Sequence, residues 1–238
     1  MGDELNRRAR AEFITASTRL VPAGLVPEIR LHLGEDPIHL WERTEKALGR
    51  AGLPPPFWAF AWAGGQALAR YLLDHPDIVR GRRVIDIATG SGLVAIAAAM
   101  AGAEVVTATD IDPLAITAVA LNAEANGVSV AAWRGDVLDG DGGVFGGAGG
   151  AGGVFEAERR LPQVALAADV FYEKDLADRV MGFLERAHAR GATVLAGDLG
   201  RRYLPRPRLR ELAAYKVAVP TVLEGTDVKR TAVWQPAW

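Results

Sequence analysis

The stretch 83–112 constrains the fold of this chain more than any other part of the sequence. Its first residues are β-branched and apolar, which is typical of a strand buried on both faces. Gly90 and Gly92 follow, where the backbone can turn sharply and approach a ligand. The residues after Gly92 are apolar on every side of a helix, so that helix should pack against a sheet. A second strand then ends at Asp110, and the whole stretch predicts a nucleotide-binding βαβ unit.

The glycine spacing alone leaves the nucleotide open. Gly90, Gly92 and Ala95 formally match the dinucleotide fingerprint, and Asp110 lies about 20 residues downstream, as in many dehydrogenases. Asp86, however, stands inside the first strand, where a dinucleotide-binding strand is usually apolar. A carboxylate there suits a ligand ammonium better than a pyrophosphate. An NAD-linked dehydrogenase, a structural glycine turn in another α/β protein, and a catalytically silent binding module all remain alternatives.

One motif favours a different ligand. The frame Asp86-x-Ala88-x-Gly90-x-Gly92 resembles motif I of the seven-strand, class I methyltransferases that use S-adenosylmethionine. The resemblance implies that this frame, with Thr89, contributes to the cofactor site of a Rossmann-like fold. Ala88 stands where that family usually has its first glycine, which we interpret as a mild departure.

Composition bounds the remaining possibilities. The 238 residues suffice for one large domain with a modest extension, and half of them are hydrophobic. A net charge of −2 argues against nucleic acid as a partner. Cysteine is absent, which excludes disulfides and thiolate metal sites. No apolar run is long enough for a membrane span, so we expect a cytoplasmic protein. We also expect a monomer. Between His32 and His39, Gly34 and Pro37 interrupt the possible ligands, so no metal site is expected.

The pattern along the chain predicts a single α/β domain with a doubly wound, mostly parallel seven-strand sheet. Residues 1–56 form an N-terminal, partly helical extension packed on the core, and residues 57–238 form the main domain. The expected strands span 28–33, 84–87, 104–109, 128–133, 163–168, 192–196, 215–222 and 228–235. The expected helices span 4–20, 41–48, 67–73, 93–100, 113–126 and 173–190, with a short one near Glu211. Residues 139–153 are rich in glycine and predict a flexible surface insert.

Four carboxylates stand at or near the ends of successive strands. Asp86, Asp110, Asp136 and Asp169 follow this pattern, and parallel strand ends share one edge of a sheet. In a methyltransferase, Asp86 would bind the methionine ammonium, Asp110 the ribose and Asp136 the adenine amino group. Asp169 would then face the methyl acceptor.

An aromatic segment precedes the glycine turn. Residues 57–62 contain four aromatic side chains just before an expected helix. At least half of these rings should plug the sheet. The others should form a wall beside the ligand, with Trp58 or Trp62 facing it.

At this point the chain resembles a named family. Residues 57–73, 109–113, 168–177 and 197–201, with shorter stretches at 26–31 and 41–43, look like the electron-transfer-flavoprotein β-subunit lysine methyltransferases. The resemblance implies methylation of lysine on that subunit with S-adenosylmethionine. It also implies cofactor contacts from Ile111, Val137 and Ala168, and catalytic roles for Asp169 and Tyr172. A methyltransferase of the same fold acting on another protein, such as a ribosomal protein, or on a small molecule is the alternative.

The acceptor chemistry leads to a sharper expectation. No cysteine, metal or suitably placed histidine offers a strong base. We therefore expect an aromatic slot, from Trp58 or Trp62 with Phe171 and Tyr172, to hold the lysine while Asp169 orients it. The alternative is that Asp169 caps the helix that begins near Glu173. Asp169→Asn should separate the two roles, because an amide can still cap.

Overall fold

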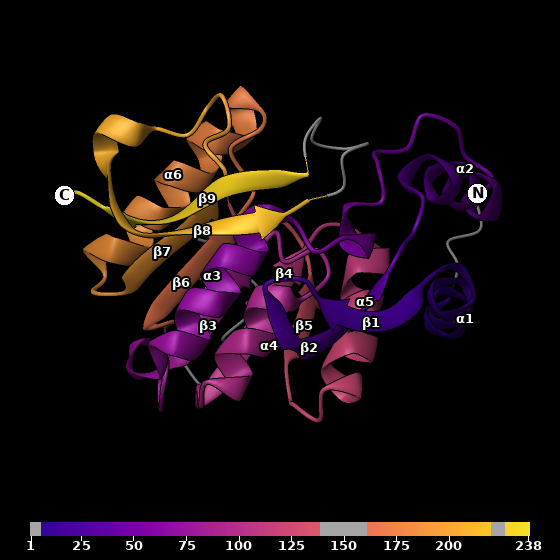
Figure 1. The fold of residues 1–238 in the computed structure, drawn as a ribbon, viewed down its shortest axis with the longest axis horizontal. Helices are drawn as coiled ribbons and strands as arrows, with labels where there is room; N and C mark the ends of the chain where they lie inside the picture. The colour runs from indigo at the N-terminus through magenta and orange to yellow at the C-terminus, as the bar shows by residue number, and fades with distance from the viewer. Residues whose placement is uncertain (1–5, 139–160, 220–226) are drawn as a thin grey trace, which may run out of the picture.

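The computed structural model describes residues 6–138, 161–219 and 227–238, and it contains a seven-stranded sheet. The strand order is β5-β4-β3-β6-β7-β9-β8 (Figure 1). The first five strands in this order pair in parallel, and β9 pairs antiparallel with both of its neighbours, β7 and β8. The strands are β3 (Arg83–Ile87), β4 (Val105–Asp110), β5 (Ala131–Arg134), β6 (Val164–Ala168), β7 (Thr193–Asp198), β8 (Leu209–Ala218) and β9 (Val228–Pro236). The chain winds outward from β3 to β5 and returns at β6, so the doubly wound, mostly parallel prediction is confirmed.

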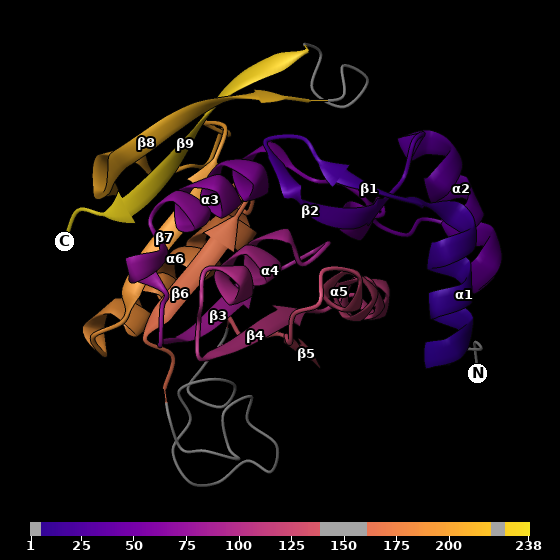
Figure 2. The same cartoon turned by 60° about the horizontal axis from the view of Figure 1, so that its bottom comes forward.

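Helices cover both faces of this sheet. They are α3 (Ala63–Asp74), α4 (Leu93–Met100), α5 (Pro113–Ala125) and α6 (Lys174–Ala189). Figure 2 shows α3, α4 and α5 on one side of the sheet and α6 on the other. Strand β3 needs a cover on both faces, because its apolar side chains alternate between them. Val84 joins the core with α3 and α4, whereas Ile85 and Ile87 join the core with α6.

The N-terminal part adds two helices and a hairpin to the core. Its elements are α1 (Arg7–Ser17), β1 (Arg19–Ala23), β2 (Val26–Leu33) and α2 (Pro37–Leu48). The predicted strand over 28–33 is therefore one arm of an antiparallel pair, and β1 was missed because Pro22 reads as a breaker. Pro22 is tolerated in β1 because a proline is compatible with an edge strand.

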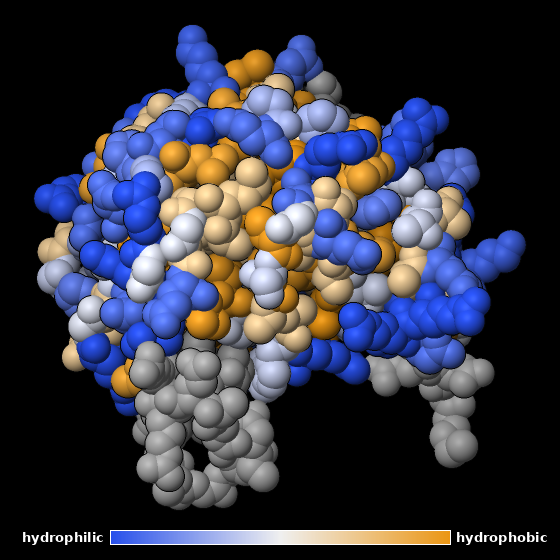
Figure 3. Space-filling model, turned by 90° about the horizontal axis from the view of Figure 1, so that it is seen from below, coloured by the Kyte–Doolittle hydropathy of each residue, from blue (hydrophilic) through white to orange (hydrophobic). Residues whose placement is uncertain are grey.

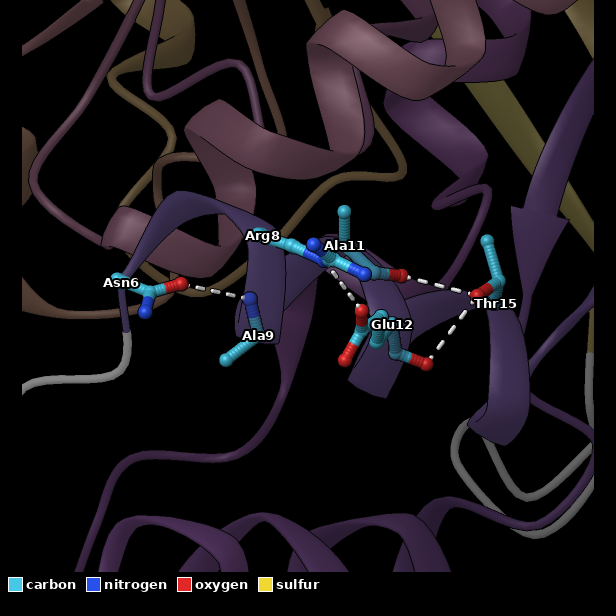
Figure 4. A network of polar contacts seen from close by, with 6 residues as sticks. All are labelled: Asn6, Arg8, Ala9, Ala11, Glu12 and Thr15. Carbon is cyan, nitrogen blue, oxygen red and sulfur yellow. Dashed lines mark hydrogen bonds and ion pairs between the residues drawn. The ribbon is translucent and has the colours of Figure 1, made fainter.

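Helix α1 is stabilised locally at its exposed surface (Figure 4). The Asn6 side chain accepts a hydrogen bond from the Ala9 N–H at 2.9 Å, which caps the helix. Arg8 and Glu12 form an i,i+4 ion pair at 2.9 Å, and both side chains are mostly exposed. Such pairs contribute only about 0.3–0.5 kcal/mol, so the packing of buried Ile14 matters more.

Two asparagines on α5 join β2 to the core. The Asn122 carboxamide accepts from the His32 N–H at 2.8 Å and donates to the Ser91 carbonyl at 2.8 Å. One turn later, Asn126 bonds both backbone groups of Arg30, at 2.9 and 2.6 Å. The amide groups thus replace a neighbouring strand along β2. Because Ser91 lies in the glycine turn, Asn122 also ties that turn to the N-terminal hairpin.

The C-terminal hairpin differs from its prediction at one point. Glu211 lies within β8, so the short helix expected there is wrong. A 3₁₀ turn at Arg206–Arg208 precedes the strand, and β8 begins before the predicted residue 215. The Pro- and Arg-rich composition obscured this strand, whose inner residues Leu209 and Val217 are buried.

Some expectations lie outside the described residues or concern the surface. The glycine-rich insert 139–153 is outside them. Within the described ranges, no helix combines the length and apolar character that crossing a membrane requires. Figure 3 shows one face of the molecule, with apolar residues gathered near its middle and hydrophilic residues toward its margins.

The Asn122 contacts generate a stability prediction. Asn122→Ala should lower the free energy of unfolding by about 2–4 kcal/mol, because it leaves the His32 N–H and the Ser91 carbonyl without their partner. Denaturant unfolding measures this change. Asn126→Ala, which removes the more exposed contacts to Arg30 of β2, is the control and should cost about 1 kcal/mol. Equal losses in the two variants would contradict the buried bridge.

Candidate functional site

The turn after β3 takes an unusual backbone path. Ala88, Gly90 and Gly92 all have positive φ, at 49°, 55° and 83°. At Gly92 a side chain would also crowd Val119 of α5, with 3.1 Å between an added Cβ and the nearest atom. Ala88 is exposed and lacks the freedom of glycine in this region. Its departure from the motif is therefore a source of strain, which corrects our interpretation of it as mild.

Asp86 lies beneath this turn. It is 1% exposed and accepts a hydrogen bond from the Thr89 hydroxyl at 2.5 Å. Burial raises the pKa of Asp86 to about 7, and the bonds from Thr89 and the Ala95 N–H oppose that rise. Asp86 thus orients the turn through Thr89, a contact that the sequence did not reveal. Its direct contact with a ligand ammonium stays a prediction.

Asp110 meets the turn from the end of β4. One carboxylate oxygen accepts from the Gly90 N–H and the other from the Asp112 N–H, both at 3.0 Å. Burial raises the pKa of this half-buried carboxyl. Asp112 caps α5 by accepting from the Leu114 N–H at 2.8 Å. The structure therefore brings Asp110 and the glycine turn into direct contact.

The next residues extend this edge of the sheet. Ile111 is 67% exposed, which is unusual for a large apolar side chain. Asp136 follows β5 and pairs with Arg179 of α6 at 2.7 Å, while Val137 is buried. Arg179 was missed because it is distant in sequence. A role for Asp136 toward adenine stays a prediction.

Asp169 caps a helix, although not the expected one. Its two oxygens accept from the Gly64 and Gly65 N–H groups at 3.0 and 2.8 Å, at the start of α3. The helix that follows Asp169 in the sequence, α6, begins after Glu173 and has no side-chain cap. The alternative that Asp169 caps the helix near Glu173 is therefore wrong. Because both oxygens accept N–H bonds, an asparagine cannot replace the cap, since its amide nitrogen would face a donor.

The cap depends on a close approach between α3 and β7. A Cβ added at Gly64 would lie 2.3 Å from the Gly197 carbonyl oxygen, so only glycine fits. The same carbonyl accepts from the Asp169 N–H at 2.9 Å. Ala168, just before this point, pairs with Gly197 across the two strands and is half-buried. The ends of β6, β7 and α3 thus meet at Gly197.

A second carboxylate lies beside Asp169. Asp198 at the end of β7 is fully buried, and its Oδ1 accepts from the Gly200 and Arg201 N–H groups at 2.6 and 2.7 Å. Its Oδ2 has no partner among the described residues. Burial, followed by the charge of Asp198, raises the pKa of Asp169 to about 7. Neither Asp198 nor Arg201 was assigned a role from the sequence, although the stretch 197–201 carried part of the family resemblance.

Three aromatic rings form a rim around this end of the site. The Phe57 ring centroid lies 5.9 Å from that of Trp62 and 5.7 Å from that of Tyr172. Tyr172 is 43% exposed, whereas Trp58 is 1% exposed and Phe171 is fully buried. Trp62 is therefore the tryptophan at the rim, and the expectation that Phe171 lines it is wrong. Phe57 takes that position. The sequence could not have indicated this, because side chains in this segment do not alternate regularly between inward and outward positions.

The backbone of Ala88 generates the first prediction from this site. Ala88→Gly should raise the free energy of unfolding by about 0.5–1 kcal/mol, because relief of the left-handed strain exceeds the entropy that glycine adds to the unfolded chain. Denaturant unfolding measures it. The control, Ala99→Gly within α4, should lose about 1 kcal/mol. A destabilised Ala88→Gly protein would contradict the strained turn.

The buried carboxyl of Asp86 generates the second. Its folded pKa of about 7 exceeds the ordinary value of about 3.9, so its contribution to stability is present at low pH and is lost as the pH rises through 7. Asp86→Asn retains an acceptor for Thr89 and removes this titration. From pH 5 to pH 8, the variant should therefore gain about 1–3 kcal/mol relative to the wild type in unfolding experiments. The same gain in the exposed control Asp77→Asn would argue against Asp86 as the origin.

Comparison with known proteins adds independent information. A family model described as ribosomal protein L11 methyltransferase (PrmA) matches residues 67–139. The electron transfer flavoprotein beta subunit lysine methyltransferase of Rattus norvegicus is 34% identical over 98% of this chain and 86% of its own length. Those of Xenopus laevis and Homo sapiens are 37% and 34% identical, over 93% of this chain and 85% and 80% of theirs. With this identity over nearly the whole chain, the protein belongs to the electron transfer flavoprotein β-subunit lysine methyltransferase family.

Proposed function

We propose that this protein transfers a methyl group from S-adenosylmethionine to a lysine of the electron transfer flavoprotein β-subunit. The observation that carries the proposal is the arrangement of one sheet edge. The glycine turn with Asp110, the Asp169 carboxyl and the aromatic rings of Phe57, Trp62 and Tyr172 all lie at this edge. The names of the relatives support this substrate and reaction.

The residues around the turn fit an adenosyl ligand. Asp110 uses one lone pair of each oxygen for backbone N–H groups, so each oxygen retains a lone pair for a ribose hydroxyl. The exposed side chain of Ile111 offers an apolar surface for the adenine, with Asp136 beyond it. The Trp58 indole N–H is buried without an acceptor in the described part of the chain, and a polar group of the ligand would supply one.

The other end of the site fits an alkyl ammonium side chain. Phe57, Trp62 and Tyr172 offer aromatic surface to the lysine stem. Asp169, with a pKa of about 7, offers a carboxyl that is partly ionised at neutral pH. The cofactor supplies an electrophilic methyl group, which the lysine nitrogen attacks as the carbon–sulfur bond breaks and sulfur keeps the electron pair. The chain's own residues would align the nitrogen for this attack. Tyr172 remains protonated, because burial and nearby carboxylates raise its pKa.

Other functions have less support. The match to the ribosomal protein methyltransferase model ends before the strands that carry Asp169 and Asp198, so it covers the cofactor half of the site. A dinucleotide-binding strand is usually apolar where the buried Asp86 stands, which argues against a dehydrogenase. A monomeric state, a cytoplasmic location and the absence of nucleic acid as a partner stay predictions.

The test combines three proteins. The wild type should methylate lysine of the purified flavoprotein β-subunit with S-adenosylmethionine, as read by mass spectrometry. Asp110→Ala should weaken S-adenosylhomocysteine binding about 10–100-fold in calorimetry, since hydrogen bonds to a charged group contribute about 1.5–3 kcal/mol. Asp169→Asn should bind S-adenosylhomocysteine normally, lose most transfer, and unfold about 1–3 kcal/mol more easily because the cap is damaged.

The outcomes separate the parts of the proposal. Asp175→Asn, on the exposed first turn of α6, is the control and should match the wild type in all three measurements. Unchanged affinity in Asp110→Ala would contradict the ribose assignment. Methylation of other proteins in a cell extract, with none on the flavoprotein subunit, would contradict the substrate.

A further inference from the structure

Arg201 occupies a defined position in the acceptor end of the site. The Asp198 carboxylate accepts from its N–H at 2.7 Å and from the Gly200 N–H at 2.6 Å, which fixes the turn after β7. Gly200 has a φ of 92°, a conformation that suits this tight turn. The turn directs the half-buried Arg201 side chain toward the rim, where its guanidinium carbon lies 5.9 Å from the Trp62 ring centroid.

The charges around Arg201 come from several elements. Asp169 at the end of β6, Tyr172 before α6 and Asp198 of β7 all interact with its positive charge. Burial, followed by the charges of Glu173 and Asp110, raises the pKa of Tyr172, and the charge of Arg206 opposes the rise that burial causes in the pKa of Asp198. Burial raises the pKa values of the Asp169 and Asp198 carboxyls, which favours their neutral forms. A guanidinium, in contrast, cannot lose its proton in a protein. Arg201 and Arg206 therefore carry constant charges, and of these two Arg201 is the one whose charge acts on Asp169 and Tyr172.

We propose that Arg201 is a positioning residue whose fixed charge favours the neutral amine of the acceptor lysine over its ammonium form. The inference rests on the proposed function and concerns the step that precedes methyl transfer. A lysine attacks through its nitrogen lone pair, so it must first release a proton to water. A cation beside the nitrogen destabilises the ammonium and thus helps this release without a dedicated base. The lone pair then forms the new N–C bond.

The geometry gives this role a physical origin. The Arg201 guanidinium lies over the Trp62 ring, which would also contact the lysine stem, so both cations approach the Asp169 carboxyl. Asp169 attracts the incoming lysine, and Arg201 limits how strongly the pocket holds it as an ammonium. The two charges thus separate capture from deprotonation.

The first experiment is a pH profile of methyl transfer. In Arg201→Gln, the apparent pKa of the acceptor should rise by about one unit, so single-turnover rates at pH 7 fall about tenfold and recover at high pH. Arg202→Gln is the matched control, because Arg202 is exposed and its guanidinium lies over Tyr203 instead of Trp62. It should retain the wild-type profile. Arg201→Lys keeps the positive charge and should restore most of the rate.

The second experiment requires no turnover. With S-adenosylhomocysteine bound, Arg201→Gln should bind the flavoprotein β-subunit at pH 7 several-fold more tightly than the wild type, because the ammonium form is no longer repelled. A merely structural role would weaken this binding. Melting temperature and S-adenosylhomocysteine affinity should be unchanged.

Each outcome decides a different point. A rate loss in Arg201→Gln that is equal at every pH, or an unchanged profile, would overturn the role of Arg201. Weaker substrate binding by this variant would overturn it as well. A wild-type protein without any transfer to the flavoprotein subunit would contradict the proposed function itself. The effects of Arg201→Gln are interpreted only relative to a wild type that transfers methyl groups.

Discussion

The two hydrogen bonds from the start of α3 to the Asp169 carboxylate hold the ends of α3, β6 and β7 together. They join residues 104 and 105 positions apart in the sequence, and they satisfy N–H groups that a helix start otherwise leaves unpaired. The positive end of the helix dipole also favours the carboxylate. Because the aromatic rim begins in the segment just before α3, this cap fixes the rim relative to β6. Any ligand held between them depends on this contact.

The cap explains why small residues gather at this point. Gly64 and Gly197 approach so closely that neither tolerates a Cβ, and Asp169 adopts a left-handed backbone with a φ of 56° to reach the helix. Asp tolerates this conformation better than most residues, at a cost of roughly 1 kcal/mol. The chain accepts the strain because the two N–H bonds and the buried contact offset it. Strain of this kind is common at functional sites, and here it serves the orientation of one carboxylate.

The sequence predicted the parallel core, the glycine turn and the place of Asp110 beside it because all three depend on local patterns. The apolar strand, the glycine turn and Asp110 lie within one continuous stretch, and the Asp112 cap follows the ordinary preference of a helix start. The surroundings of Asp169 could not be predicted in the same way. Its contacts join segments 57–65, 169–172 and 197–201, and nothing in their separate sequences specifies which helix Asp169 caps. Strand β8 was partly missed for a related reason, since pairing with β9 overrides its Pro- and Arg-rich start.

The strand-end carboxylates differ in the protein groups from which they accept hydrogen bonds. Asp86 accepts from a side-chain hydroxyl, and Asp110 from the N–H of Gly90 in the turn and that of Asp112 before α5. Asp169 accepts from two N–H groups at a helix start. Each carboxylate therefore organises its surroundings before any ligand arrives. A carboxylate has about four lone-pair sites, so those at Asp110 and Asp169 retain capacity for a ligand. Groups held in this way need little rearrangement when charge moves during a reaction, which is the main advantage of a preorganised site. Carboxylates that look alike in the sequence therefore have different structural roles: Asp86 and Asp110 hold the turn after β3, and Asp169 holds the start of α3.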